Sequence, residues 1–200
     1  MKSKKVPWNH NYAYNQWVSK KVEKRNSILD VGCGDGTLAL YLRTKDNNIV
    51  GIDISNSSIQ KANKKNSHSN VSFVQTSFED LVAKNGSFDA IIFVASIHHM
   101  DMVNAVDKAK KLLAKYGVLI IVGLAKPSTL IDKIVELTRI IPSKIVSSIK
   151  ENKTSEELNI DVSYDFPTMN EVRHICNEKL SGYILKYGLH YRYLLTWENN

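Results

Sequence analysis

The residues with the clearest chemical potential form a glycine-rich segment, Asp30-Val-Gly-Cys-Gly-Asp-Gly36. It stands between an apolar run typical of a strand, Ser27–Gly32, and a segment with helical spacing, Thr37–Arg43. Glycine has no Cβ atom and tolerates positive φ, so a ligand can lie against the backbone. The N-terminus of the following helix offers free amide groups, which suit a carboxylate or a phosphate. The segment therefore predicts a ligand-binding loop.

A second chemical signal is Asp53, at the end of the next strand, Asn48–Asp53. A carboxylate there can accept hydrogen bonds from both hydroxyls of a ribose. In open α/β sheets the ligand lies at the carboxyl ends of the strands, so the loop and Asp53 would share one edge. Together they indicate a nucleoside cofactor. A dinucleotide is disfavoured, because its G-x-G-x-x-G pattern requires glycine or alanine where Thr37 stands.

Two adjacent histidines, His98 and His99, follow the fourth predicted strand and would stand at the same edge. Imidazole titrates near neutrality, so either could take a proton from a hydroxyl or ammonium group. The alternative is that one packs or caps the next helix while the other lines the pocket passively. Metal binding by the pair is disfavoured, since no carboxylate or third histidine stands at convincing ligand spacing. Asp101 is interpreted as the cap of the helix that begins at Met102.

Apolar runs alternate with helical segments along the first part of the chain. The further predicted strands are Val71–Gln75, Phe88–Val94 and Val118–Val122. The helices are predicted at about Tyr12–Lys24, Thr37–Arg43, Ser57–Asn66 and Met102–Lys115, the last stopped by Gly117. This alternation favours βαβ units, and near-continuous apolar strands favour a sheet covered on both faces. The sequence therefore predicts an α/β fold with a doubly wound, mostly parallel sheet.

The pattern changes after Gly123. Pro127–Lys150 carries apolar residues at helical spacing, interpreted as a packed helix pair in preference to a pocket lid or a membrane-surface contact. Thr168-Met-Asn-Glu171 has the pattern of a capping box that opens a helix to about Lys179. Two aromatic runs, Tyr183–Tyr187 and Tyr191–Trp197, predict an antiparallel hairpin that ends the sheet.

Charge and cysteine content limit the other function classes. The chain has 27 Lys and Arg against 20 Asp and Glu, a net charge of +7, but the lysines form short clusters typical of solvated helix faces. Two cysteines, Cys33 and Cys176, make no disulfide framework and favour a reducing compartment, the cytoplasm. Cys33 is interpreted as a small loop residue and not a nucleophile. No apolar run reaches the ~18 residues of a membrane span, and the basic start lacks the apolar region of a secretory signal.

An acidic residue followed by G-x-G-x-G, with Asp53 at the next strand end, resembles the class I S-adenosylmethionine-dependent methyltransferases. The resemblance runs from about Ile28 to Val122, roughly half of the chain, and includes the fourth-strand phrase Phe88–Met100 and the entry to strand five at Leu112–Leu119. More narrowly, the Trp8-Asn-His-Asn start and the Tyr191–Trp197 end resemble a branch of small bacterial methyltransferases. The resemblance implies a Rossmann-like, seven-stranded, mostly parallel sheet with a C-terminal antiparallel hairpin and helices on both faces.

The resemblance also implies a role for each site residue. The loop residues, which border the methionine part of S-adenosylmethionine, are Asp30, Gly32, Cys33, Gly34 and Gly36. Asp53 binds the ribose and Ile54 packs on the adenine, with Ser77 and Phe78 at the adenine edge and Val94 and Ala95 beneath the sulfonium. Many relatives have aspartate where Ser77 stands, which weakens the expected adenine contact. Core packing is an equal alternative for Phe78.

The resulting prediction is a single methyltransferase domain over residues 1–200. Its segments are an N-terminal helical lid (1–25), a cofactor-binding core (26–125), a helical insertion suited to a substrate lid (126–165), and a C-terminal helix and hairpin (166–200). For His10, Tyr12 and Tyr14, ordinary helix packing is the alternative to the lid.

The expected activity is transfer of a methyl group to a small-molecule acceptor by in-line displacement, with neither nucleic acid nor membrane as partner. One alternative is an RNA or DNA methyltransferase. It is disfavoured because Ala95-Ser-Ile-His98 replaces the Asn/Asp-Pro-Pro-aromatic motif that many base-methylating enzymes carry after strand four. The other is a protein that binds S-adenosylmethionine without catalysis.

Overall fold

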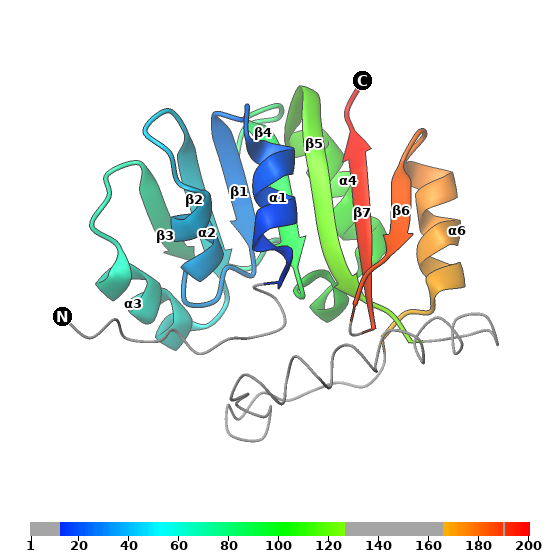
Figure 1. Ribbon diagram of the computed structural model, residues 1–200, viewed down its shortest axis with the longest axis horizontal. Coiled ribbons are helices and arrows are strands. Elements are labelled where there is room, and N and C mark those ends of the chain that lie inside the picture. The colour runs from blue at the N-terminus through cyan, green and yellow to red at the C-terminus, as the bar shows by residue number, and fades with distance from the viewer. Residues whose placement is uncertain (1–12, 127–165, 190) are drawn as a thin grey trace.

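The computed structural model describes residues 13–126, 166–189 and 191–200. Within them, one mixed sheet has the strand order β3-β2-β1-β4-β5-β7-β6 (Figure 1). The strands are β1 (Ser27–Val31), β2 (Asn48–Asp53), β3 (Val71–Gln75), β4 (Phe88–Val94), β5 (Leu113–Leu124), β6 (Ile184–Tyr187) and β7 (Arg192–Glu198). Strands β1 to β5 pair in parallel, whereas β7 runs antiparallel to both β5 and β6. This confirms the predicted doubly wound, Rossmann-like sheet with its C-terminal hairpin.

The strand order turns back between β1 and β4. From β1 the sheet continues to β2 and β3 on one side, and from β4 to β5 on the other. Helical connections therefore leave these two neighbouring strands in opposite directions, and an opening forms at their carboxyl ends. The candidate site is expected at this edge of the sheet.

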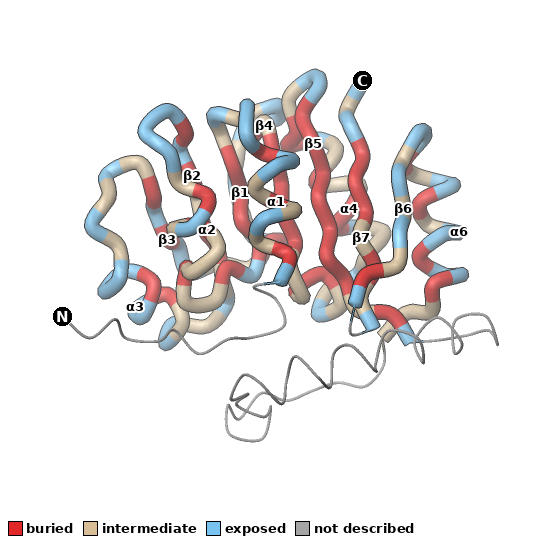
Figure 2. The backbone as a smooth tube through the Cα atoms, viewed as in Figure 1, coloured by how far each residue is buried: buried red, intermediate tan, exposed pale blue. Residues whose placement is uncertain are grey.

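Each central strand buries both of its faces (Figure 2). Ile28, Ile92 and Ile120 pack on one side of the sheet, where α1 (Asn15–Val22), α2 (Thr37–Leu42) and α3 (Asn56–Lys65) supply the opposing apolar residues. Their neighbours in sequence, such as Leu29 and Ile91, face the other side, covered by α4 (Met102–Leu112) and α6 (Met169–Lys179). The burial of successive side chains on opposite faces explains why these strands read as continuous apolar runs.

Side-chain caps fix where three helices begin. Ser55 accepts a hydrogen bond from the backbone of Ser58 at the start of α3, and Asp101 does the same for Asn104 at the start of α4. At α6, Thr168 and Glu171 form the reciprocal capping box that the sequence predicts. In each case the side chain satisfies a backbone N–H that the first turn leaves without a partner.

The boundary between α4 and β5 differs from the sequence prediction. The helix expected to run to Lys115 ends at Leu112, and Leu113 already pairs with Phe88 of β4. Leu113 and Phe88 are both buried in the same core cluster, so packing against β4 outweighs the helical pattern. Asn199 also stabilises the beginning of β5, because its side-chain amide donates hydrogen bonds to the carbonyls of Leu113 and Ala114.

No helix in the three described stretches combines the length and the apolar character needed to cross a membrane. Residues 1–12 of the predicted N-terminal lid (1–25) and residues 127–165 of the predicted insertion (126–165) lie outside these stretches.

Close packing between β5 and β7 makes a specific demand at Gly123. A Cβ atom at Gly123 would lie 2.2 Å from the ring of Tyr193, which is fully buried. We expect Gly123→Ala to lower the free energy of unfolding by about 1–3 kcal/mol, the usual cost of overpacking a core. Urea unfolding followed by circular dichroism measures this. In a Tyr193→Leu background the same substitution should cost at least about 1 kcal/mol less, and equal costs in both backgrounds would show that the two residues do not collide.

Candidate functional site

The glycine loop follows β1 at the point where the strand order turns back. Gly32, Gly34 and Gly36 all have positive φ, between 55° and 75°. Gly34 faces open space, with no atom within 4 Å of the position a Cβ would take. Gly32 is in the opposite situation, because a Cβ there would lie 2.4 Å from the Cβ of Ser96. The loop thus needs glycine for its conformation at all three of these positions and for close packing at Gly32 and Gly36.

Asp53, at the end of β2, lies directly beside this loop. Its Oδ2 accepts a hydrogen bond from the backbone N–H of Gly34 at 2.9 Å, and its Oδ1 accepts one from the N–H of Ser55 at 2.8 Å. A carboxylate offers about four lone-pair positions, so two remain for a ligand. The structure therefore brings together the two groups that the sequence singled out first.

Asp30 lies beneath the loop and is 1% exposed. Its Oδ2 is buried without a hydrogen-bond partner in the described part of the structure. Burial, and secondly the negative charge of Asp53, raise the pKa of Asp30 from 3.8 to about 7. An acid of this kind is a strong candidate for contact with a cationic or hydrogen-bond-donating ligand.

Asp35, in the same loop, is held by residues of α2 and α3. Its carboxylate accepts hydrogen bonds from the ammonium group of Lys65 and from the hydroxyl of Thr37. Burial alone would raise the pKa of Asp35, but these hydrogen bonds hold it below its ordinary value. Asp35 therefore anchors the outer side of the loop.

The end of β4 closes the other side of the opening. Val94 and Ala95, expected beneath the sulfonium, are half-buried there, and Ala95 adopts a left-handed conformation with φ of 53°. The next residue, Ser96, is buried and donates its hydroxyl to the carbonyl oxygen of Val31 at 2.6 Å. Non-glycine residues in this conformation often occur at functional sites. Sequence reasoning missed Ser96, because a lone serine after a strand gives no signal of this contact.

The residues expected around an adenine differ in their placement. Ile54 follows Asp53 and is 72% exposed, so an apolar surface is available beside the loop. The hydroxyl of Ser77 donates to Oδ2 of Asp80 and also accepts from the Asp80 backbone. The side chain of Phe78 is buried and meets Phe93 edge to face at 5.2 Å between ring centres. Core packing is therefore the role that the structure supports for the Phe78 side chain.

Two further sequence interpretations concern Cys33 and Tyr14. Burial and the nearby acidic side chains raise the pKa of the Cys33 thiol, so this loop residue is unsuited to act as a thiolate nucleophile. Tyr14 is buried, and its hydroxyl donates to the carbonyl and accepts from the N–H of Leu189. Packing, the alternative to a lid, thus describes Tyr14, while His10 and Tyr12 lie outside the described residues.

The two histidines after β4 have different surroundings. They lie on the short 3-10 turn η2 (Ile97–His99), with ring centres 4.0 Å apart. His99 is exposed, whereas His98 is half-buried and meets Phe166 edge to face at 5.0 Å. Among the described residues, no third metal-ligating side chain joins the pair in a cluster that could hold a metal ion.

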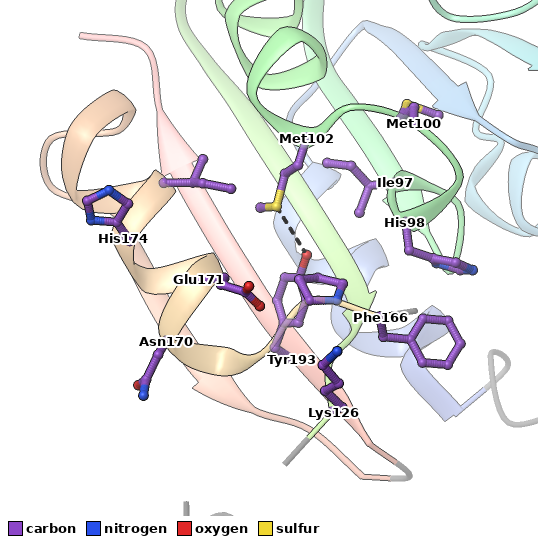
Figure 3. Close-up of a pocket in the computed structure, with 12 residues that line it drawn as sticks. Ile97, His98, Met100, Met102, Lys126, Phe166, Asn170, Glu171, His174 and Tyr193 are labelled. Atoms are coloured by element: carbon purple, nitrogen blue, oxygen red, sulfur yellow. Dashed lines mark hydrogen bonds between the residues drawn. The ribbon is translucent and has the colours of Figure 1, made fainter. Parts of the chain in front are cut away.

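His98 lines a pocket of about 710 Å³ between η2, the start of α4 and the first turns of α6 (Figure 3). The described residues around it are Ile97, His98, Met100, Met102, Lys126, Phe166, Pro167, Asn170, Glu171, His174, Ile175 and Tyr193. These residues are widely separated in the sequence: Ile97 and Tyr193 are 96 residues apart. No short sequence motif therefore predicts the pocket. Of the two predicted histidines, only His98 lines it.

The raised pKa of Asp30 makes a prediction about stability. The folded protein keeps a proton on this acid that the unfolded chain has already lost, so the associated stability is complete below about pH 4 and is lost as the pH rises through about 7. Asp30→Asn removes this loss, because an amide stays neutral. We expect the Tm of the variant, relative to wild type, to rise between about pH 5.5 and about pH 8.5 in thermal melts without ligand.

The matched control for this experiment is Asp35→Asn. The pKa of Asp35 is lowered, so its titration falls below the tested range and its Tm difference from wild type should stay constant there. If the Tm of Asp30→Asn and the Tm of wild type changed with pH in parallel, this would contradict the conclusion that buried Asp30 keeps its proton in the folded protein.

The chain is similar to known proteins in sequence and in fold. Residues 28–117 match the family described as a methyltransferase domain. An uncharacterised methyltransferase of Mycobacterium tuberculosis is 26% identical over 194 residues, covering 96% of each chain. Among solved structures, a protein from Pyrococcus horikoshii gives a TM-score of 0.69 at 20% identity, covering 94% of this chain and 89% of that chain. Geranyl diphosphate methyltransferase, solved with GPP and sinefungin, gives 0.67 at 12% identity, covering 94% and 79%.

The matched segment begins in β1 and contains the glycine loop, Asp53 and the end of β4. The similar structures share the fold over nearly the whole chain. The sequence of residues 28–117 is therefore similar to methyltransferase domains, and the similarity to the solved structures is one of fold.

Proposed function

We propose that this protein binds S-adenosylmethionine at the glycine loop and transfers its methyl group to a small-molecule acceptor. The observation that carries the proposal is the pair of carboxylates at the ends of β1 and β2. Asp53 is bonded to the open backbone of Gly34, and Asp30 is buried beneath the same loop with an oxygen left without a partner.

The residues present fit this cofactor. The unpartnered oxygen of Asp30 suits the ammonium group of a methionine moiety, and the remaining lone pairs of Asp53 suit ribose hydroxyls. Gly34 leaves room for a ligand against the backbone, and the exposed side chain of Ile54 offers an apolar surface to an adenine. S-adenosylmethionine supplies a methyl group on a sulfonium, which is already an excellent leaving group.

The charge of the site supports a cationic ligand. Two carboxyl groups, one of them fully buried, lie close enough for the charge of Asp53 to raise the pKa of Asp30. A bound positive charge would favour the ionised form of Asp30 and relieve this repulsion. Cofactor binding should therefore release a proton near neutral pH.

A small molecule is the acceptor class that the pocket favours. Its volume of about 710 Å³ lies in the range typical of small-molecule sites. One of its lining residues, Ile97, directly follows Ser96, whose hydroxyl is hydrogen-bonded to the end of β1. The segment that borders the glycine loop therefore leads directly into the wall of the pocket.

His98 is the group we assign as proton acceptor when the acceptor still carries its proton. Its imidazole lines the pocket, whereas His99 is exposed and does not. The enzyme needs mainly to hold the acceptor in line with the methyl group and to exclude water. A base is required only for acceptors that are protonated at neutral pH.

The ribose assignment is tested with Asp53→Asn. The amide keeps one oxygen as acceptor but loses the negative charge, and hydrogen bonds to charged groups contribute about 1.5–3 kcal/mol. We expect the affinity for S-adenosylmethionine to fall by about tenfold or more in isothermal titration calorimetry. The demethylated product should show a comparable loss, since it has the same ribose.

Asp89→Asn is the matched control. Oδ2 of Asp89 also accepts two backbone N–H groups, from Asn26 and Ser27, but at the amino-terminal edge of the sheet. Cofactor affinity should therefore be unchanged in this variant. Wild-type affinity in Asp53→Asn would remove the ribose assignment, and failure of the wild type to bind S-adenosylmethionine would refute the proposed function.

A further inference from the structure

The pocket between η2 and α6 has an apolar interior. The apolar side chains that line it come from η2, α4, β7 and the segments next to α6: Ile97, Met100, Met102, Phe166, Pro167, Ile175 and Tyr193. Tyr193 is fully buried, and its hydroxyl points to Met102, 3.9 Å from the sulfur atom (Figure 3). A ligand in this pocket therefore gains mainly by removing apolar surface from water.

The charged groups at the rim of the pocket compensate one another. Glu171 already caps α6, because its Oε2 accepts from both the backbone and the hydroxyl of Thr168. These hydrogen bonds, and further the positive charge of Lys126, lower the pKa of Glu171. The helix N-terminus thus has a negative group in place, and Lys126 has a negative neighbour. This arrangement gives no net attraction for an anionic ligand.

His98 adds one polar group that suits a hydrogen-bond donor. Its Nδ1 is buried and has no hydrogen-bond partner among the described residues. Burial, and then the nearby His99 and Arg192, lower the pKa of His98 to about 4, so the imidazole is neutral at physiological pH. A neutral imidazole has one nitrogen that accepts a hydrogen bond.

From these observations we infer that the pocket selects a neutral, mainly apolar acceptor that carries a hydroxyl group, and that His98 accepts the hydrogen bond from this hydroxyl. The inference rests on the proposed function, which it deepens by naming the acceptor class. A charged ligand, whether ammonium or carboxylate, would lose hydration in this mainly apolar pocket, where Lys126 and Glu171 already offset one another. A hydroxyl avoids this penalty and can donate a hydrogen bond to the imidazole of His98.

The corresponding reaction is an O-methylation. The acceptor oxygen forms a bond to the methyl carbon while the carbon–sulfur bond breaks, and its electron pair stays on sulfur. The hydroxyl proton passes to the imidazole of His98 and from there to water. As the oxygen becomes bonded to carbon its proton becomes strongly acidic, so a weakly basic imidazole is sufficient to accept it.

The test uses four compounds that share one eight-carbon chain: 1-octanol, octyl methyl ether, octanoate and octylammonium. They are titrated into the full-length protein saturated with S-adenosylhomocysteine, and 2-naphthol with its methyl ether serves as a second, aromatic pair. We expect each hydroxyl compound to bind about fivefold or more tightly than its ether, which corresponds to one net hydrogen bond. Octanoate and octylammonium should bind more weakly than 1-octanol.

Substitution of the two histidines separates the hydrogen bond from general packing. In His98→Phe the preference for hydroxyl over ether should fall to about twofold or less, since an apolar ring fills the same space. His99→Phe is the matched control and should keep the wild-type preference, because His99 is exposed and does not line the pocket.

Two results would overturn the inference. One is equal or tighter binding of the ether, anion or cation; the other is no binding of either hydroxyl compound by a protein that does bind S-adenosylmethionine. Selective hydroxyl binding that depends on His98, in a protein that fails to bind S-adenosylmethionine, would instead support the pocket's selectivity and refute the proposed function. Failure of the inference about the pocket can therefore be distinguished from failure of the proposed function.

Discussion

The hydrogen bond between the backbone of Gly34 and the carboxylate of Asp53 joins two neighbouring strand ends, and the geometry of the candidate site depends on it. On the opposite side, Ser96 fastens the end of β4 to the end of β1 through the carbonyl of Val31. The glycine loop is thereby held from both directions at the point where the strand order turns back. Its left-handed backbone is open at Gly34 and closely packed at Gly32 and Gly36.

Two regions at this edge of the sheet differ in their electrostatic character. Below the loop, burial and a second carboxylate raise the pKa of Asp30 to about 7, so this region gains from a bound cation. Beyond η2, by contrast, Lys126 and Glu171 offset one another and His98 is neutral. A cationic methyl donor beside a neutral acceptor would match both regions without leaving a charge buried and uncompensated.

Most of the fold follows from local sequence pattern. Predominantly apolar runs predicted β1 to β4 to within about one residue at each end. The signal holds although Asp30, Ser72 and Asp89 stand within these strands and β3 is partly exposed, because the remaining apolar residues are mostly buried. The capping box at Thr168 located α6 for a similar reason, since its hydrogen bonds lie within one turn. The α4–β5 boundary was wrong, because Leu113 takes its conformation from a partner 25 residues away, Phe88.

For the candidate site, the sequence by itself determined the groups at the strand ends: the glycine loop, Asp30 and Asp53 have characteristic spacing, and parallel strands necessarily place their carboxyl ends together. Only the tertiary structure decided which histidine lines the pocket, that the Phe78 side chain belongs to the core, and that Ser96 holds the loop. These outcomes depend on contacts between residues from separate elements. Local sequence carries no record of such contacts, since they form only when the elements pack against one another.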